Sequence, residues 1–133
     1  MDCIFCKIAN GEIPSATIYE DEDFRVILDL GPATKGHSLI LPKKHYESLV
    51  ELPEELAAKS ICLAKKLLPK YKEGLGCDGL QLVQNNGEAA GQTVFHYHLH
   101  MIPAYKEDAP GAKWKPGNLS DEDKEKIVKA LKD

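Results

Sequence analysis

The segment Phe95-His96-Tyr97-His98-Leu99-His100-Met101-Ile102 alternates apolar side chains with imidazoles. Successive side chains of a β-strand point to opposite faces, so this alternation predicts a strand, running from Thr93 to Ile102. The three histidines are then expected to form a row on one face of it. The other face is expected to pack on the core through the apolar members of the segment, Phe95, Tyr97, Leu99 and Met101.

Shorter apolar runs elsewhere predict further strands, at residues 16–20, 24–29, 37–41 and 80–84. Residues 53–71 carry apolar side chains at spacings of three and four, which predicts one long helix, and Pro69 is expected to kink or end it. Ser120, followed by three acidic residues, predicts the start of a short C-terminal helix. Together these elements predict an α+β fold: a mainly antiparallel sheet with one long helix and a short C-terminal helix.

A chain of 133 residues suits a single domain, with residues 104–133 as a C-terminal extension expected to pack on it. The formal charge of -4 provides no general basic field, which argues against nucleic acid as a partner. No apolar run approaches the ~20 residues of a membrane helix, and the first residues lack the pattern of an export signal. We therefore expect a cytoplasmic protein with no membrane partner.

Three of the five histidines lie within five residues. A row of imidazolium ions would repel itself, so at least one ring should be neutral near pH 7, with a free nitrogen lone pair. Such rings could share one catalytic metal, or a central ring could attack phosphorus as a nucleophile. The preceding loop, residues 87–93, favours the second interpretation, because its backbone amides and the side chains of Gln92 and Thr93 can bind phosphate oxygens.

The stretch from Gly91 to Ile102 resembles the signature of the histidine-triad superfamily, His-φ-His-φ-His-φ-φ with φ apolar, preceded by Gly-Gln-Ser/Thr-Val. The likeness extends to Cys3-Ile4-Phe5-Cys6-Lys7-Ile8, Glu12-Ile13-Pro14 and Pro42-Lys43-Lys44-His45, and is greatest to the Hint-like nucleotide-binding branch. This resemblance implies a HIT-like fold and a homodimer, with the predicted helix 53–71 and strand 80–84 in the contact region.

The same resemblance implies a hydrolase or nucleotidyl transferase that cleaves nucleoside 5'-phosphoramidates, preferring purines. The reaction would pass through a covalent nucleotidyl-histidine and release a nucleoside monophosphate. A dinucleoside polyphosphate hydrolase of the same superfamily is an alternative, which differs in its leaving group. A non-catalytic nucleotide-sensing module, in which the triad only binds phosphate, is another.

Matched position by position, the resemblance implies that His98 is the nucleophile and that His100 is its phosphate-binding partner. His37 matches a position that supports the triad. The other nucleotide-binding residues that the resemblance implies are Gln92 and Thr93 for the phosphate and leaving group, Asn85 for a phosphate or ribose oxygen, Asp29 for the ribose hydroxyls, and Phe5, Ile8, Ile27 and Leu39 for the base. From residue type alone, the apolar members are more typical of core than of a binding site, and Asp29 and Asn85 are also typical of turns.

Cys3 and Cys6 form a Cys-x-x-Cys pair, which is typical either of redox chemistry or of a metal site. Redox pairs usually open a helix after a strand, and no strand is predicted before Cys3, so a metal is favoured. A closed tetrahedral zinc site needs two more ligands. The resemblance to microbial members that carry this pair implies a structural zinc held by Cys3, Cys6, His45 and His96, which leaves His98 and His100 for phosphate.

Overall fold

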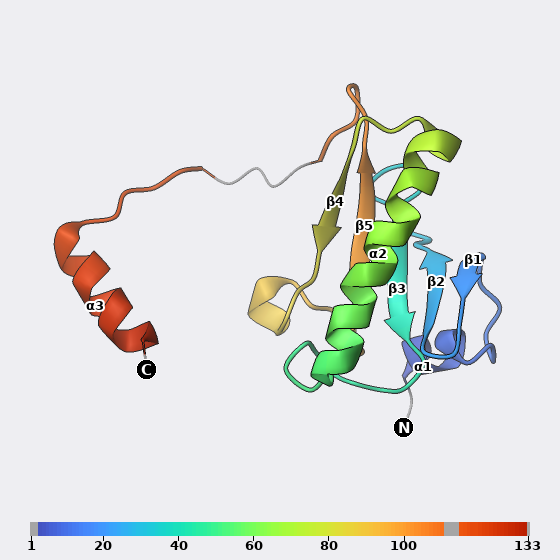
Figure 1. Ribbon diagram of the computed structural model, residues 1–133, viewed down its shortest axis with the longest axis horizontal. Coiled ribbons are helices and arrows are strands. Elements are labelled where there is room, and N and C mark those ends of the chain that lie inside the picture. The colour runs from blue at the N-terminus through green and yellow to red at the C-terminus, as the bar shows by residue number, and fades with distance from the viewer. Residues whose placement is uncertain (1–2, 111–114, 133) are drawn as a thin grey trace.

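The computed structural model describes residues 3–110 and 115–132, and within them a five-stranded antiparallel sheet is crossed by one long helix (Figure 1). The elements are α1 (Ile4–Ala9), β1 (Thr17–Glu20), β2 (Phe24–Leu28), β3 (Ser38–Pro42), α2 (Glu54–Leu75), β4 (Gly79–Val83), the 3-10 turn η1 (Glu88–Ala90), β5 (Leu99–Ala104) and α3 (Asp121–Leu131). The strand order is β1-β2-β3-β5-β4, with every neighbouring pair antiparallel. The predicted α+β class is confirmed.

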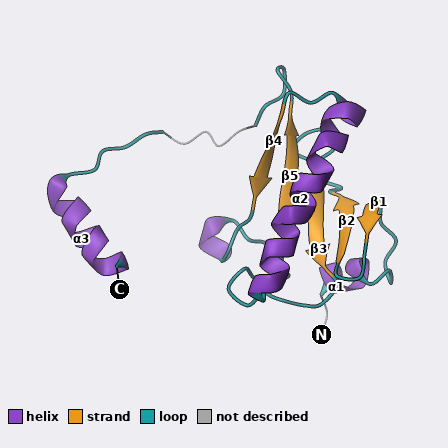
Figure 2. Cartoon of the chain, in the orientation of Figure 1, coloured by secondary structure: helices purple, strands orange, loops and turns teal. Residues whose placement is uncertain are grey.

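The sheet buries apolar side chains on both faces. Successive residues of a strand point alternately toward α2 on one face and toward α1 on the other. Phe24 and Val26 of β2 join the larger core beneath α2. Ile27, with Leu39 and Leu41 of β3, forms a smaller core with Ala9 of α1. Figure 2 shows α2 running the length of the sheet and α1 beside the ends of β2 and β3. The face beside α1 also receives His100 of β5, which pairs with Leu39.

The predicted long helix is present and extends past Pro69 to Leu75, so Pro69 does not end it, and a kink there stays a prediction. Proline removes the hydrogen bond to the carbonyl four residues earlier, at Lys65. Both Lys65 and Pro69 are exposed, so water can satisfy that carbonyl and the helix continues. It ends at Gly76, whose left-handed φ of 67° suits a helix C-cap.

The strand predicted over residues 93–102 begins only at Leu99, so His100 is the single triad histidine within it. The last pair between β3 and β5 is Ile40 with Leu99, and β4 ends at Val83, opposite His100. Before that point the chain leaves the sheet, and the Tyr97 amide donates to the Tyr46 carbonyl at 2.6 Å. Tyr97, Leu99 and Met101 are buried as expected, whereas Phe95 is 46% exposed and does not join the core.

The C-terminal helix α3 begins where predicted, since the Ser120 hydroxyl accepts a hydrogen bond from the Asp123 amide. The extension is bonded to the domain at its start, where the Tyr105 hydroxyl donates to the Lys35 carbonyl at 2.8 Å. Every residue of α3 is exposed, and α3 lies apart from the sheet in Figure 1. The packing of residues 104–133 on the domain stays a prediction. None of the helices in the described part of the chain has the length and apolar character to cross a membrane.

Candidate active site

A cavity of about 400 Å³ lies on the sheet face beside α1. The predicted site residues that line it are Phe5, Ile8, Ile27, Asp29, Leu39, Thr93, His98 and His100. Sequence reasoning missed the segment after α1, residues 13–16, which also lines the cavity. The motif Glu12-Ile13-Pro14 was the available signal for this segment, but it carries no chemistry that would assign a role.

One end of the cavity is apolar and the other is polar, which suits a ligand with a flat apolar body and an anionic group. Phe5 marks the boundary, because its ring packs edge-on against His98, with centroids 5.1 Å apart and planes at 87°. His98 and His100 are neighbours at the polar end, with ring centroids 4.9 Å apart. Thr93 also lines the cavity and is exposed.

The tautomer of His98 follows from one hydrogen bond. Its Nδ1 lies 2.8 Å from the carbonyl oxygen of His96, which can only accept, so Nδ1 carries the proton. Burial lowers the pKa of His98 below its usual value, which keeps the ring neutral near pH 7. The lone pair is therefore on Nε2, and no hydrogen bond occupies Nε2 within residues 3–110 and 115–132. A neutral imidazole held in this way can act as a nucleophile.

The tautomer of His100 is set through His37. The backbone amide of Ala33 donates to Nδ1 of His37 at 2.9 Å, so neutral His37 carries its proton on Nε2. That Nε2 donates to Nδ1 of His100, also at 2.9 Å, which leaves the His100 proton on Nε2. Burial lowers the pKa of both rings, that of His100 to about 4, where the neighbouring His98 and His37 add to the effect. His100 is thus a neutral hydrogen-bond donor at the cavity.

The sequence left Asp29 either as a turn former or as a ligand of the ribose hydroxyls, and its side chain is placed so that it can do both. One carboxylate oxygen, Oδ1, accepts from the Gly31 amide at 2.8 Å, as a turn former does. The other, Oδ2, lies 3.6 Å from Nε2 of His37, and the side chain is 24% exposed where it lines the cavity. One oxygen therefore shapes the turn, and the other can accept from a ligand hydroxyl.

Gln92 and Asn85 do not line the cavity. The buried Gln92 amide builds the preceding loop: its nitrogen donates to the carbonyls of Glu47 and Val94, and its oxygen accepts from the Gly87 amide. Asn85 lies against Gly91 in the same loop. The expected contacts of both residues with a nucleotide stay predictions.

The side chains of Cys3, Cys6, His45 and His96 meet at one place, with all four potential ligand atoms within 4.8 Å of one another. The sulfur-to-nitrogen distances are 3.5 Å from Cys3 to His96, 3.3 Å from Cys6 to His45 and 3.4 Å from Cys6 to His96. Zn–S bonds of ~2.3 Å and Zn–N bonds of ~2.0 Å at a tetrahedral angle put sulfur and nitrogen about 3.5 Å apart. The spacing of this group fits zinc.

The protonation of the group also fits a cation. Nε2 of His96 lies 2.9 Å from the Pro42 carbonyl oxygen, so it carries the proton and leaves the Nδ1 lone pair facing the sulfurs. Burial, with Cys3 alongside, raises the pKa of the Cys6 thiol to about 11. A cation is therefore needed to hold the Cys6 sulfur as a thiolate near neutral pH.

The alternative of one catalytic metal shared by the triad does not match this arrangement, because His96 turns toward the cysteines. Asp29, His37 and His100 form a second group with ligand atoms within 4.8 Å. Its chemistry is different, since the His37 lone pair already accepts from Ala33 and its Nε2 carries a proton. No group containing all three triad histidines occurs among the residues that the structure describes.

The buried neutral histidines make stability depend on pH. The pKa of His100 is lower in the folded chain, so the unfolded chain binds more protons between pH 6.5 and about 4, and stability falls as the pH drops through that range. Between pH 7 and pH 5 we expect wild type to lose about 2 kcal/mol more than His100→Gln, which cannot titrate. Urea unfolding of both proteins at the two pH values, with zinc present, measures this difference. Equal losses would contradict a neutral buried His100.

Comparison with known proteins adds sequence relatives. The HIT domain family matches residues 10–107. An uncharacterised HIT-like protein of Methanocaldococcus jannaschii is 45% identical over 130 residues, covering 98% of each chain. The adenosine 5'-monophosphoramidase of Schizosaccharomyces pombe is 37% identical, over 98% of this chain and 93% of its own. An adenylylsulfatase of Arabidopsis thaliana is 43% identical, over 80% of this chain and 54% of its own.

Solved structures share the fold. The crystal structure of a HIT family protein from Bacillus anthracis superposes with a TM-score of 0.87 at 40% identity, over 98% of this chain and 94% of its own. A zinc-bound histidine triad family protein from Mycobacterium smegmatis superposes with a TM-score of 0.76 at 38% identity, over 98% and 92%. The arrangement of the sheet and α2 is thus one already observed in crystals.

Proposed function

This chain belongs to the HIT domain family, and on that premise we propose that it is a nucleotide hydrolase. Its substrates would be nucleoside 5'-phosphoramidates, with a purine preferred, and its product a nucleoside monophosphate. The observation that carries the proposal is the His98 ring, neutral, fixed by the His96 carbonyl and bordering a cavity of about 400 Å³. The relative named as an adenosine 5'-monophosphoramidase supports the substrate class.

The reaction begins with His98. Its Nε2 lone pair attacks the α-phosphorus, and a phosphorus–nitrogen bond forms as the bond to the leaving amine breaks. The amine takes up one proton from solvent as it leaves, and the later attack of water returns one proton to solvent. Because Nδ1 stays bonded to the His96 carbonyl, the ring that gains positive charge remains oriented and partly neutralised. Water then attacks the nucleotidyl-histidine and releases the nucleoside monophosphate, which regenerates neutral His98.

The phosphoryl charge needs donors, and the cavity supplies them. Nε2–H of His100 is one, held in place by His37, and the exposed Thr93 hydroxyl is another. Asp29 would accept from the ribose hydroxyls, and the wall formed by Phe5, Ile8, Ile27 and Leu39 would enclose the base. These donors supply positive potential without a metal at the reacting phosphorus.

We place a structural zinc in the group Cys3, Cys6, His45 and His96, where the donor set and the spacing fit it. The zinc-bound relative from Mycobacterium smegmatis supports this assignment. Bound there, zinc supplies a cross-link rather than chemistry, because it ties the amino terminus and α1 to the segment that carries His98. His96 then acts as a ligand and a spacer, two residues from the nucleophile.

A second copy of this chain is the expected protein partner. The outer edge of β4 carries no strand in the described residues, and a free edge is a template for pairing. Leu82 of β4 and Ile61 of α2 are exposed apolar side chains in the predicted contact region. The homodimer and a cytoplasmic location stay predictions.

Turnover of defined substrates tests the proposed function. We expect adenosine 5'-phosphoramidate to be hydrolysed to AMP and ammonia, with kcat/KM at least about tenfold above that for a diadenosine polyphosphate. The cavity measures about 400 Å³ and is lined for one nucleoside, so a second would gain little from it. Chromatography of the nucleotide products measures both rates. The reverse order would favour the dinucleoside alternative, and AMP binding without turnover of either would favour a sensing module.

A further inference from the structure

The helix α1 is too short to hold its own shape. It has six residues, whereas isolated helices below ~12–15 residues are marginal in water. Yet it carries Phe5 and Ile8, which wall the apolar end of the cavity. The metal group restrains only its amino-terminal half, through Cys3 and Cys6. Something must therefore fix its carboxyl-terminal end.

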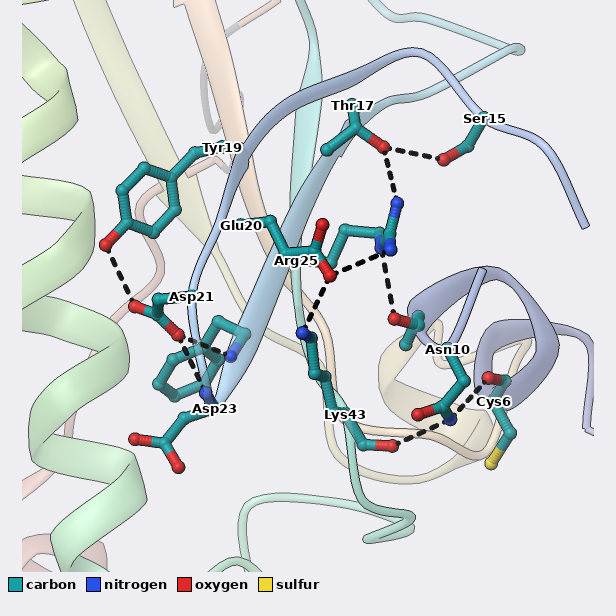
Figure 3. A network of polar contacts seen from close by, with 12 residues as sticks. Cys6, Asn10, Ser15, Thr17, Tyr19, Glu20, Asp21, Asp23, Arg25 and Lys43 are labelled. Atoms are coloured by element: carbon teal, nitrogen blue, oxygen red, sulfur yellow. Dashed lines mark hydrogen bonds and ion pairs between the residues drawn. The ribbon is translucent and has the colours of Figure 1, made fainter. Parts of the chain in front are cut away.

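Arg25 of β2 reaches that end. Its Nε donates to the carbonyl of Ala9, the last residue of α1, at 3.0 Å. The guanidinium is held in turn by the Thr17 hydroxyl at 3.0 Å and by the Glu20 carboxylate at 2.9 Å. Figure 3 shows Arg25 at the centre of this network. A cation on the last carbonyls of a helix also opposes the negative end of its dipole.

The network extends from Arg25 through Glu20 to Lys43. The Glu20 carboxylate accepts from Lys43 at 2.7 Å, so one carboxylate joins the two cations. Asn10, which follows α1, donates from its side chain to the carbonyls of Cys6 and Lys43 at 2.8 and 3.1 Å (Figure 3). The carboxyl-terminal end of α1 is thus bonded both to β2 and to the residue that follows β3.

The position of Arg25 on its strand links it to the cavity. Alternate residues of β2 share a face, so Arg25 lies on the same face as Ile27 and, past the end of the strand, Asp29. Ile27 packs on α1, and both Ile27 and Asp29 line the cavity. The arginine side chain is only 16% exposed, which is unusual for a surface charge.

We infer that Arg25 is a positioning residue that sets the width of the base pocket by clamping the carboxyl-terminal end of α1. With the clamp, Phe5 and Ile8 are held against the base. Without it, α1 can pivot about its metal-bound end and the apolar wall opens. Phe5 touches His98, but His98 and His100 are held by their own hydrogen bonds to the His96 carbonyl and to His37, so the clamp acts on base binding and not on the chemical step. The inference rests on the proposed nucleotide site.

The test compares two ligands that differ only in the base. In the full-length, zinc-loaded chain, Arg25→Leu should bind AMP about tenfold more weakly, because part of the apolar contact is lost. Binding of ribose 5-phosphate, which has no base, should change by less than about twofold. In turnover, KM should rise while kcat is maintained. Arg25→Lys, which keeps a charged donor, should restore part of the AMP affinity.

Hydrogen exchange supplies a readout that needs no ligand. The amides of residues 10–13 bond back to carbonyls of α1, so their exchange should quicken in Arg25→Leu. The matched control is Lys59→Leu on α2, which removes an ion pair with Asp23, the residue before β2, and leaves α1 untouched. AMP affinity and exchange equal to wild type would overturn the inference, as would an equal loss for both ligands.

The outcomes separate the clamp from the proposed function. If wild type binds neither ligand, the proposed function fails, and exchange at residues 10–13 then decides alone whether Arg25 holds α1. If Arg25→Leu does not fold, the same comparison is made with Arg25→Lys and with Asn10→Ala, which removes the second tie to α1. Unchanged AMP affinity in both of these folded variants would overturn the inference.

Discussion

Replacing His98 with alanine will abolish nearly all turnover of a nucleoside phosphoramidate, a loss of order 10³-fold or more. The substitution removes the atom that forms the bond to phosphorus, and no other described group at the cavity is a neutral imidazole with its lone pair free. Binding of AMP should survive largely intact, because the base wall, Asp29 and the donors of Thr93 and His100 remain. Steady-state kinetics and calorimetry measure the two quantities separately.

The neighbouring histidines serve as matched controls, because each has a different role. His100→Ala removes one phosphate donor and should cost less, of order 10²-fold. His96→Ala removes a proposed zinc ligand and should act mainly through metal content and stability. Comparable losses of turnover for all three, together with metal loss from a folded protein that abolishes activity, would instead favour the shared catalytic metal.

Rapid quenching with a radiolabelled nucleotide identifies the nucleophile directly. A phosphorus–nitrogen bond to histidine is acid-labile and base-stable, so wild type should carry label with that stability during turnover. The label should be absent from His98→Ala and present in His96→Ala under conditions where the latter is folded. Label retained by His98→Ala would place the nucleophile elsewhere.

Removal of both cysteines, in Cys3→Ala with Cys6→Ala, will strip the chain of zinc and lower its free energy of unfolding by roughly 4 kcal/mol, the linkage value for about a thousandfold excess of zinc over its Kd. Two of the four ligands are lost, and the remaining pair, His45 and His96, cannot close a tetrahedral site. Elemental analysis should fall from about one zinc per chain to a trace. Urea unfolding measures the stability.

Cys62→Ala is the matched control for that experiment, because Cys62 is an exposed cysteine of α2 outside the metal group. It should keep full zinc content and wild-type stability. Full zinc occupancy in the double variant would refute the assignment. Turnover per folded molecule should fall by a smaller factor than the folding equilibrium constant does. Zinc supports the position of α1 and the His98 segment but contacts no reacting atom.

The tertiary structure makes the three histidines of the row different from one another, which the sequence pattern did not predict. Alternation along residues 95–102 predicts a strand with three equivalent imidazoles, and a continuous ladder would have kept them equivalent. The ladder stops at Leu99, the last residue of β5 that pairs with β3, although β3 itself continues to Pro42. His96 is then free to turn its Nδ1 to the cysteines, while His98 and His100 remain at the cavity.

By itself, the sequence determined the class of fold, the order of its main elements and the set of chemical groups. Hydrophobic periodicity is a local property, so it located most strands and the long helix to within a few residues, although it began the last strand six residues too early. The Cys-x-x-Cys pair and the histidine motif supplied the candidate metal ligands and nucleophile. The family membership follows from the same motifs.

Only the tertiary structure decided which proton sits on which nitrogen and what holds α1. The tautomer of His98 is set by its hydrogen bond to the His96 carbonyl, and that of His100 by its hydrogen bond to His37, 63 residues away in the sequence. The last carbonyl of α1 accepts a hydrogen bond from Arg25. An isolated arginine in a strand has no pattern that predicts its partner, because hydrogen-bond partners and burial are set by segments that meet only in the folded chain. For that reason the tautomers and the clamp had no signal in the sequence, although the residues that form them are all in it.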